Sequence, residues 1–446
     1  MRIRTMEVWK YISLSVLGML GASGTILADT FFVSNRLGPT GLAALNIAIS
    51  IFGLLNGVGI LFGMGGATRY AILKSRSQEK QADSAFTLSL LCALGVGAGF
   101  LLLGLFGASN LARALGASGD LLPLCSTYLR TVLYFAPFFI ANHFFMALIR
   151  NDGNPKLAMC AMVSGSLANI ILDYLFLYPL HLGIFGAALA TGLSPLIGLT
   201  ISSLHGLTKR NQFHLTRVSF GPSHLRAITS LGLSAFVNEL SSSLVLVVFN
   251  LLLLNAAGTI GVAAYGIVAN LALVVLAVFT GIAQGLQPLL SRSYGTGHTQ
   301  EARSLLRKGQ LCALLVGIVV WAASALWAPA LAALFNSAGD PLLQTLAEEG
   351  LVLYFGGFLF LGYNYMSAAF LSATERGRSA FWISLFRGCV GITVSACLMA
   401  RFWGVTGIWL SFPVVELGTL LLSWALQRPR TTPADSTCAA PLPTSR

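Results

Sequence analysis

The sequence predicts an all-α integral membrane protein with twelve transmembrane helices in two six-helix, pseudo-symmetric lobes. Three observations lead to this fold class. Of the 446 residues, 56% are hydrophobic and only 9% are charged, whereas soluble domains carry about a quarter charged residues. Apolar runs long enough to cross a bilayer follow one another along the chain. Finally, the second half of the sequence repeats features of the first half.

The apolar runs reach the roughly 20 residues that a transmembrane helix needs. Several are longer than one bilayer thickness, which predicts tilted or projecting helices. The tail at 428–446 is rich in Pro, Thr, Ser and Ala and is expected to be disordered. The expected spans are 9–34, 39–72, 85–107, 120–149, 156–178, 183–206, 225–257, 259–291, 305–335, 341–372, 378–403 and 404–427.

Basic residues are distributed unequally between the two sides of these spans. With the N-terminus inside, the inner segments carry all but four of the 27 Lys and Arg residues, and Arg387 is counted among them. The positive-inside rule therefore predicts that both termini are cytoplasmic and that the number of spans is even. We expect no nucleic-acid partner, because basic stripes interleaved with aromatic residues are absent. The four remaining residues are Arg36, Arg113, Arg130 and Arg401.

The repeat is visible in short motifs. Residues 41–49 (GLAALNIAI) resemble residues 261–269, 220 positions later, and the GIFG motif at Gly183 resembles the GVTG motif at Gly404, 221 positions later. With six spans each, both halves enter the membrane from the same side and are parallel repeats. The expected division is an N-lobe at 1–206, a cytoplasmic inter-lobe loop at 207–224 and a C-lobe at 225–427.

Catalytic motifs are missing from the sequence. There is no GxxxxGK[ST] phosphate-binding loop, no HExxH pair, no metal-spaced His/Cys cluster and no GxSxG elbow. We therefore expect neither an enzyme nor a bound cofactor.

Four acidic residues fall well inside the expected spans: Asp29, Asp173, Glu239 and Glu416. Each costs about 2.5–3.5 kcal/mol to insert, even on a lenient scale. Asp29 and Asp173 lie about six and about five residues from the outer ends of spans 1 and 5, so both are about 8 Å deep at 1.5 Å per residue.

Two further oxygen-bearing residues reach this depth. Asn169 precedes Asp173 by four residues and shares its helix face, and Thr191 lies about eight residues into span 6. Two carboxylates, an amide oxygen and a hydroxyl suit a hard cation such as Na⁺. They equally suit one shared proton, because two close buried acids resist double ionisation.

The alternative is that these polar groups only satisfy one another. The repeat argues against that interpretation. At the repeat offsets Asp29 falls on Phe249 and Asp173 falls near Val394, so the second half keeps the packing glycines without the acids. A requirement of the scaffold would be expected in both halves.

Three other polar residues are candidates for a substrate cavity. Glu239 lies at mid-depth in span 7, and Gln284 and Gln287 share one side of span 8 near Pro288, where a kink is expected. For each, a structural hydrogen bond or simple packing is the competing interpretation. Satisfied core residues or snorkelling side chains are expected at Glu416, Arg130 and His143.

Five stretches of the chain resemble the multidrug and toxic compound extrusion (MATE) family, in its bacterial DinF/MepA-like branch. Similarity runs along most of residues 10–425, and the NIILD and GIAQGLQP motifs are the most specific. The five stretches are residues 28–52, 150–159, 168–177, 182–195 and 261–295.

This resemblance implies a V-shaped pair of lobes in the bacterial inner membrane that exports drugs or metabolites while Na⁺ or H⁺ enters. It implies a small-molecule substrate, a coupling cation and a monomer. Many members carry an N-lobe cation site of Asp, Asn, Asp and Thr, whose counterparts here are Asp29, Asn169, Asp173 and Thr191.

The sequence departs from the family pattern twice. Some members bend helix 1 at a proline, whereas span 1 here contains Gly18, Gly21 and Gly24 instead. Another branch pairs a helix-7 Glu with a helix-10 Asp, and only Glu239 has a counterpart here. Two other functions stay open: a lipid-linked saccharide flippase of a related superfamily, and a non-transporting membrane scaffold.

Overall fold

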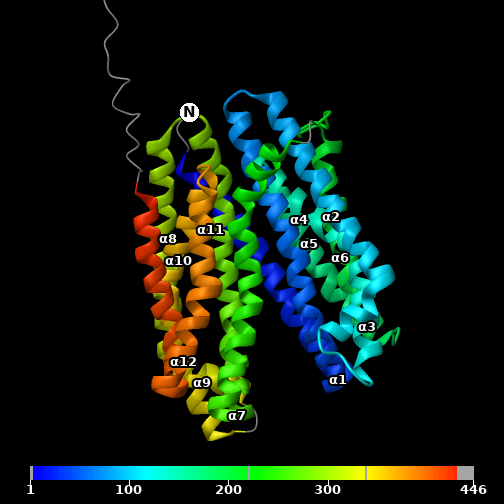
Figure 1. Ribbon diagram of the computed structural model, residues 1–446, viewed down its shortest axis with the longest axis vertical. Coiled ribbons are helices and arrows are strands. Elements are labelled where there is room, and N and C mark those ends of the chain that lie inside the picture. Colours follow the sequence, from blue (N-terminus) through cyan, green and yellow to red (C-terminus); the bar gives the residue numbers. More distant parts are fainter. Residues whose placement is uncertain (1–3, 219–220, 337–338, 429–446) are drawn as a thin grey trace, which may run out of the picture.

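The structure of the protein is a computed structural model (Figure 1), and the residues described are 4–218, 221–336 and 339–428. Nearly all of these residues are helical, because a bilayer offers backbone groups no partner outside the helix itself. The elements are α1 Thr5–Ser75, α2 Glu79–Ala114, α3 Leu121–Tyr134, α4 Ala136–Asn151, α5 Pro155–Leu177, α6 Gly183–Leu207, α7 Pro222–Gly295, α8 Thr299–Phe335, α9 Pro341–Leu353, the 3₁₀ turn η1 Tyr354–Gly357, α10 Phe358–Ala373, α11 Gly377–Leu385, the π turn η2 Phe386–Val390 and α12 Gly391–Gln427.

These helices supply the twelve predicted spans. Within the described residues, nine helical segments are long and apolar enough to cross a membrane, and α3 with α4 forms one more span, bent by 49°. Two of the nine are double, because α7 and the α11–α12 segment are broken at Gly258 and Gly404, where φ is 65° and 57°. Gly38, with φ 66°, separates the first two spans in the same way. Side chains rarely tolerate such angles, so glycine is favoured at each break.

Left-handed residues recur in the two halves of the chain. Each of the five positive-φ residues described in the second half has a counterpart 220 to 223 residues earlier, so the repeat seen in two short motifs extends along the chain. The counterparts in the first half are Gly38, Ser77, Gly116, Gly153 and Gly183, and the residues in the second half are Gly258, Gly297, Gly339, Glu375 and Gly404.

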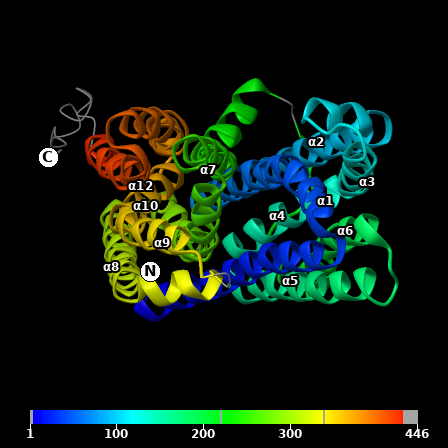
Figure 2. The ribbon, with the colours of Figure 1, turned by 90° about the horizontal axis from the view of Figure 1, so that it is seen from below.

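The helices form two bundles that stand side by side (Figures 1 and 2). Helices α2–α6 and most of α1 surround a core that includes Leu133 and Phe144, and α7–α12 surround a core that includes Phe279, Phe358 and Trp409. We call these bundles the N-lobe and the C-lobe. The predicted disordered tail lies outside the described residues, except for Arg428.

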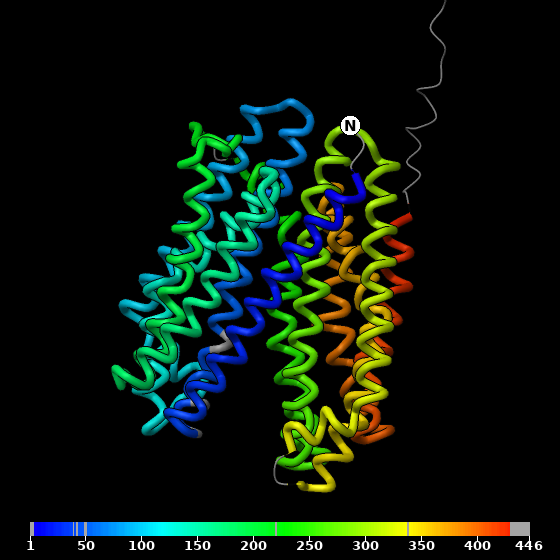
Figure 3. Tube along the Cα trace, turned by 180° about the vertical axis from the view of Figure 1, so that it is seen from behind, coloured from blue at the N-terminus to red at the C-terminus, as the bar shows by residue number. Residues whose placement is uncertain are grey.

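The first segment of α1 belongs to both lobes. Its beginning, including Tyr11 and Ile12, is buried in the C-lobe core. A Cβ added at Gly285 of α7 would lie 2.7 Å from the Tyr11 carbonyl oxygen, so only glycine allows this approach. Further along, Gly18 packs against Met162 of α5. Figure 3 shows the segment crossing obliquely from one lobe to the other.

The two lobes are joined on the side of the molecule that carries the N-terminus and the end of α12, called the terminus side below. Glu375, in the α10–α11 turn, accepts hydrogen bonds from Arg69 and, at 2.8 Å, from Arg76. Contacts continue to the middle of the membrane, where a Cβ on Gly53 would lie 3.2 Å from Ser243 Oγ. Beyond this level the described residues form no inter-lobe hydrogen bond or ion pair, and the lobes diverge.

Candidate functional site

Asn169 connects three helices of the N-lobe. This residue of α5 is fully buried, and its Nδ2 donates to Asp29 Oδ1 of α1 at 2.8 Å. Its Oδ1 accepts from the backbone N–H of Thr191 of α6 at 3.3 Å, and these two partners fix the orientation of the amide. Thr191 Oγ1 donates to the Ala187 carbonyl at 3.0 Å, so the hydroxyl oxygen keeps lone-pair capacity for another ligand.

Asp173 lies one turn beyond Asn169 on α5 and is 1% exposed. Its carboxyl group is in hydrogen-bonding contact with that of Asp29. Two carboxylates cannot share such a contact unless a proton or another cation compensates their charge. No basic side chain in the described ranges forms an ion pair with either acid. The charge of this acid pair therefore depends on the cation that it holds.

A small cavity of about 40 Å³ lies beside Asp29, large enough for a water molecule or an ion. Tyr128 of α3 lines it together with Thr191, and the two hydroxyl groups lie near each other. Sequence reasoning missed this tyrosine, because a single phenol in an apolar run is only a weak signal. The lining residues are Ile26, Asp29, Thr30, Leu45, Ala48, Phe52, Tyr128 and Thr191.

The four residues expected at one depth, Asp29, Asn169, Asp173 and Thr191, thus lie together. Their arrangement offers carboxylate, amide and hydroxyl oxygens to a hard cation, or one shared position to a proton. Their role in binding a cation stays a prediction.

Glu239 lies at the surface where the C-lobe faces the N-lobe. Its carboxylate lies within reach of the side chain of Asn56 of α1. Asn56 Oδ1 lies 3.1 Å from His143 Nε2 of α4. Glu239, Asn56 and His143 form a polar group between the lobes at mid-depth, so a molecule that passes between the lobes would meet a partly exposed carboxylate. Sequence reasoning missed Asn56, because an uncharged amide in an apolar run gives only a weak signal.

Gln284 and Gln287 lie nearer the terminus side, in the contact between the lobes. Gln284 Oε1 accepts from Arg150 at 2.7 Å, and Gln287 Oε1 accepts from Asn151 Nδ2 at 2.9 Å. Gln287 also donates to Thr68 and is 2% exposed. In this conformation both side chains hold the lobes together and are not free to line an open cavity.

The C-lobe contains a buried ion pair that the sequence did not predict. Arg387 of η2 donates to Glu416 Oε1 of α12 from Nε at 2.9 Å and to Asn238 of α7 at 3.1 Å. Glu416 Oε2 accepts from Asn364 at 2.7 Å, and the guanidinium group lies 4.5 Å from the centre of the Tyr365 ring. The expectation that Glu416 is a satisfied core residue agrees with these contacts.

The position of Arg387 corrects the sequence analysis, which counted it with the charges of the inner segments. It lies about 15 Å into its span and is only 9% exposed. Hydropathy alone could not place it there, because its partner Glu416 lies on a different span. Arg130, where a satisfied core residue or a snorkelling side chain was expected, has an exposed side chain, which excludes the first of these.

The MatE family model matches residues 15–175 and 234–397, which together are more than two thirds of the chain. The chain is 26% identical to the multidrug export protein MepA of Staphylococcus saprophyticus over 401 residues, which are 86% of each chain.

Solved structures match over nearly the full length. A crystal structure of MATE in complex with MaL6 superimposes with a TM-score of 0.88 at 24% identity over 94% of both chains. The outward-facing conformation of a multidrug resistance MATE family transporter of the MOP superfamily gives a TM-score of 0.88 at 23% identity, also over 94% of both chains. At this identity the likeness concerns the fold.

Proposed function

This chain belongs to the MatE family, and from that premise we propose that it is a secondary active efflux transporter that exports drugs or metabolites in exchange for H⁺ or Na⁺. The observation that carries the proposal is the contact between Asp29 and Asp173 in the N-lobe. An acid pair without a basic partner inside the membrane is costly unless it serves a cation. The names of its relatives, multidrug export proteins, support a broad cargo range.

The proposed orientation places the protein in the bacterial inner membrane with the terminus side in the cytoplasm. The Lys and Arg residues gather on that side, as the positive-inside rule requires. Because the lobes are joined there and diverge towards the other side, the conformation is outward-facing. A C-terminal reporter that is active only in the cytoplasm should be active, and activity of a reporter specific for the periplasm would reverse the orientation.

Coupling follows if the cation and the cargo favour different conformations. Each ligand shifts the equilibrium only through its different affinity for the two states. A cation that enters from outside would bind Asp29 and Asp173 and change the packing of α1 against α5 and α6. Because the start of α1 is anchored in the C-lobe, this change reaches both lobes. Cargo would bind between the lobes and favour the other packing.

The cargo class that the inter-lobe surface favours is organic cations and amphiphiles. Glu239, supported by Asn56 and His143, offers a negative charge at mid-depth between the lobes. Aliphatic and aromatic side chains around it would accept apolar parts of a ligand. Small molecules, the coupling cation and lipid are then the partners of a monomeric transporter, and catalysis has no part in this cycle.

The two other functions are less well supported. A lipid-linked saccharide flippase needs a cationic cavity for pyrophosphate, whereas the deep Arg387 is neutralised by Glu416. A scaffold without transport has no need for the acid pair.

The decisive experiment uses the purified protein in liposomes that hold a fluorescent organic cation. An inward-directed Na⁺ or pH gradient should drive its export against a concentration gradient, and collapsing the gradient with an ionophore should stop it. Equal dye movement with and without either gradient would refute a coupled exporter. Saturable Na⁺ binding at fixed pH would assign the coupling ion as Na⁺, and its absence alongside proton-driven export would assign H⁺.

A further inference from the structure

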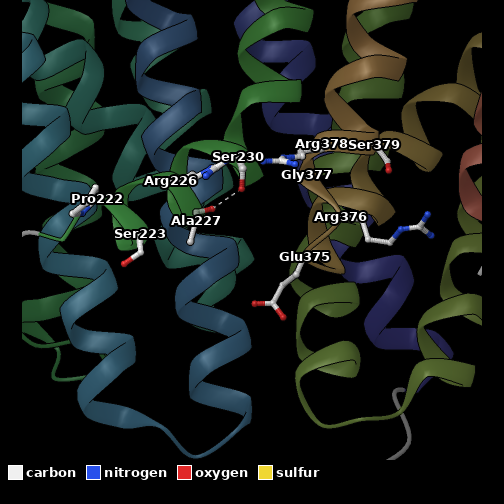
Figure 4. A pocket seen from close by; sticks show the side chains of 10 residues that line it. All are labelled: Pro222, Ser223, Arg226, Ala227, Ser230, Glu375, Arg376, Gly377, Arg378 and Ser379. Atoms are coloured by element: carbon white, nitrogen blue, oxygen red, sulfur yellow. Dashed lines mark hydrogen bonds between the residues drawn. The ribbon is translucent and has the colours of Figure 1, made fainter. Parts of the chain in front are cut away.

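A cavity of about 720 Å³ lies on the terminus side of the C-lobe, away from the acid pair and from Glu239. It forms where the beginning of α7 meets the turn between α10 and α11 (Figure 4). It is lined by Pro222, Ser223, Arg226, Ala227, Ser230, Glu375, Arg376, Gly377, Arg378 and Ser379. Nothing in the transport cycle described above uses it.

The wall of this cavity is strongly basic. The side chains of Arg226 and Arg378 are exposed and form no ion pair or hydrogen bond within the part of the chain that the structure describes. The one acid of the lining, Glu375, is already bound on its two oxygens by Arg69 and Arg76. Two guanidinium groups therefore stay uncompensated beside the cavity.

Helix geometry adds to this positive field. Both α7 and α11 begin at the cavity, and neither helix start has a side-chain cap, so the positive dipole ends of both helices lie at this region. The first residue of α7, Pro222, has no N–H group of its own. The hydroxyls of Ser223 and Ser379 supply further donors. A Cβ at Gly377 would lie 2.1 Å from the Ser230 carbonyl oxygen, so the start of α11 packs closely against the third turn of α7.

We propose that this cavity binds a phosphate group, carried either by an anionic lipid headgroup or by a free phosphate anion. Guanidinium groups bind phosphate through two parallel hydrogen bonds, and uncapped helix starts favour the same charge. The volume exceeds that of a single phosphate, so a glycerol-linked headgroup also fits. On the proposed orientation the cavity faces the cytoplasmic leaflet, where both sources are present.

Binding there would affect the contact between the lobes. The phosphate would join the start of α7 to the α10–α11 turn, and that turn carries Glu375, which binds Arg69 and Arg76 of the N-lobe. A bound phosphate therefore stabilises the arrangement in which the terminus side is closed. This consequence rests on the proposed transport cycle, whereas the binding itself does not.

Thermal unfolding of the full-length protein in a phosphate-free, non-ionic detergent tests the proposal. One arm adds inorganic phosphate at constant ionic strength, and the other adds phosphatidylglycerol to the micelles, with phosphatidylcholine as its control. We expect a saturable rise in Tm of about 2 °C in at least one arm. Arg226→Gln combined with Arg378→Gln should weaken the apparent affinity at least tenfold.

Matched variants distinguish a specific phosphate-binding site from a non-specific effect of positive charge. Arg303→Gln combined with Arg307→Gln removes two exposed arginines of α8 and should leave the response unchanged. Arg226→Lys combined with Arg378→Lys keeps the charge but removes the paired hydrogen bonds, and it should give an intermediate affinity. If the double Gln variant does not fold, the affinity of this Lys variant tests the proposal. A response to inorganic phosphate assigns a free anion, and a response to phosphatidylglycerol alone assigns a headgroup. No saturable response, or an equal loss in the α8 variant, would overturn the proposal.

Discussion

Each lobe buries a pair of ionisable side chains, and the two pairs are opposite in kind. The N-lobe pair, Asp29 and Asp173, consists of two acids beside a small cavity. The C-lobe pair, Arg387 and Glu416, consists of a base and an acid in direct contact at 2.8 Å. At the repeat position of Asp29 the C-lobe carries Phe249, which is fully buried.

This difference between the two pairs indicates which lobe can respond to a transported cation. An acid–base pair is neutral without any bound ion, and its partners are already satisfied by neighbouring amides. Two acids in contact need a cation, so their state changes when an ion arrives or leaves. We infer that ion coupling belongs to the N-lobe, whereas the C-lobe pair holds its helices in place.

The largest effect is expected at the acid pair. Asp29→Asn or Asp173→Asn should abolish gradient-driven efflux, because the remaining carboxyl can stay neutral with one retained proton and no longer shares a cation with a second carboxylate. Removal of an acid at this depth lowers the cost of insertion, so the protein should still fold. Efflux from liposomes measures the first outcome, and gel filtration with the Tm measures the second. Native rates of concentrative efflux in either mutant would show that the pair has a structural role only.

Substitutions in the C-lobe pair should have the opposite effect to those in the acid pair, because they should lower stability and leave ion coupling intact. Arg387→Gln leaves Glu416 buried without its partner and should destabilise the protein by about 3–5 kcal/mol, measured by unfolding in detergent. The double mutant Arg387→Gln with Glu416→Gln should recover most of this stability and retain coupled efflux. If the double mutant folds but loses coupling as Asp29→Asn does, the inference that confines coupling to the N-lobe fails.

An intermediate effect is expected where the lobes face each other. Glu239→Gln should raise the KM for cationic cargo by about tenfold, because a charge-assisted contact is lost. Neutral cargo and the dependence on the coupling ion should change little. Transport assays with a matched pair of cationic and neutral dyes give the comparison. Loss of ion-driven transport for every cargo would transfer the coupling role to Glu239.

The smallest effect is expected at the glycines where the helices break, and it should be of similar size in both lobes. Gly38→Ala and Gly258→Ala each force a side chain into a left-handed conformation, although no neighbouring atom lies within 4 Å of the added Cβ. Each should cost about 1–2 kcal/mol, seen as similar decreases in Tm that add in the double mutant. A transport defect in Gly38→Ala alone would show that the N-lobe break moves during coupling.

The sequence predicted the features that depend on local order along the chain. Apolar runs indicated the spans, and depth along spans 1 and 5 brought Asp29 and Asp173 to one level. It could not predict the partners of Arg387 or the contact of Glu239 with Asn56, because these depend on how distant helices pack. Likewise, the sequence indicated Gln284 and Gln287 as candidates for a substrate cavity, but their hydrogen bonds between the lobes depend on the conformation of the protein.

The oblique course of α1 also has a consequence for biogenesis. Val16 leaves the ribosome first, yet the glycine against which it packs, Gly281, is synthesised 265 residues later. At about 5–20 residues per second this is a delay of roughly 13–53 s. During that interval the surface of the first helix that packs against the C-lobe faces lipid or an insertion chaperone. The order of synthesis therefore makes docking of α1 onto the C-lobe a late step in assembly.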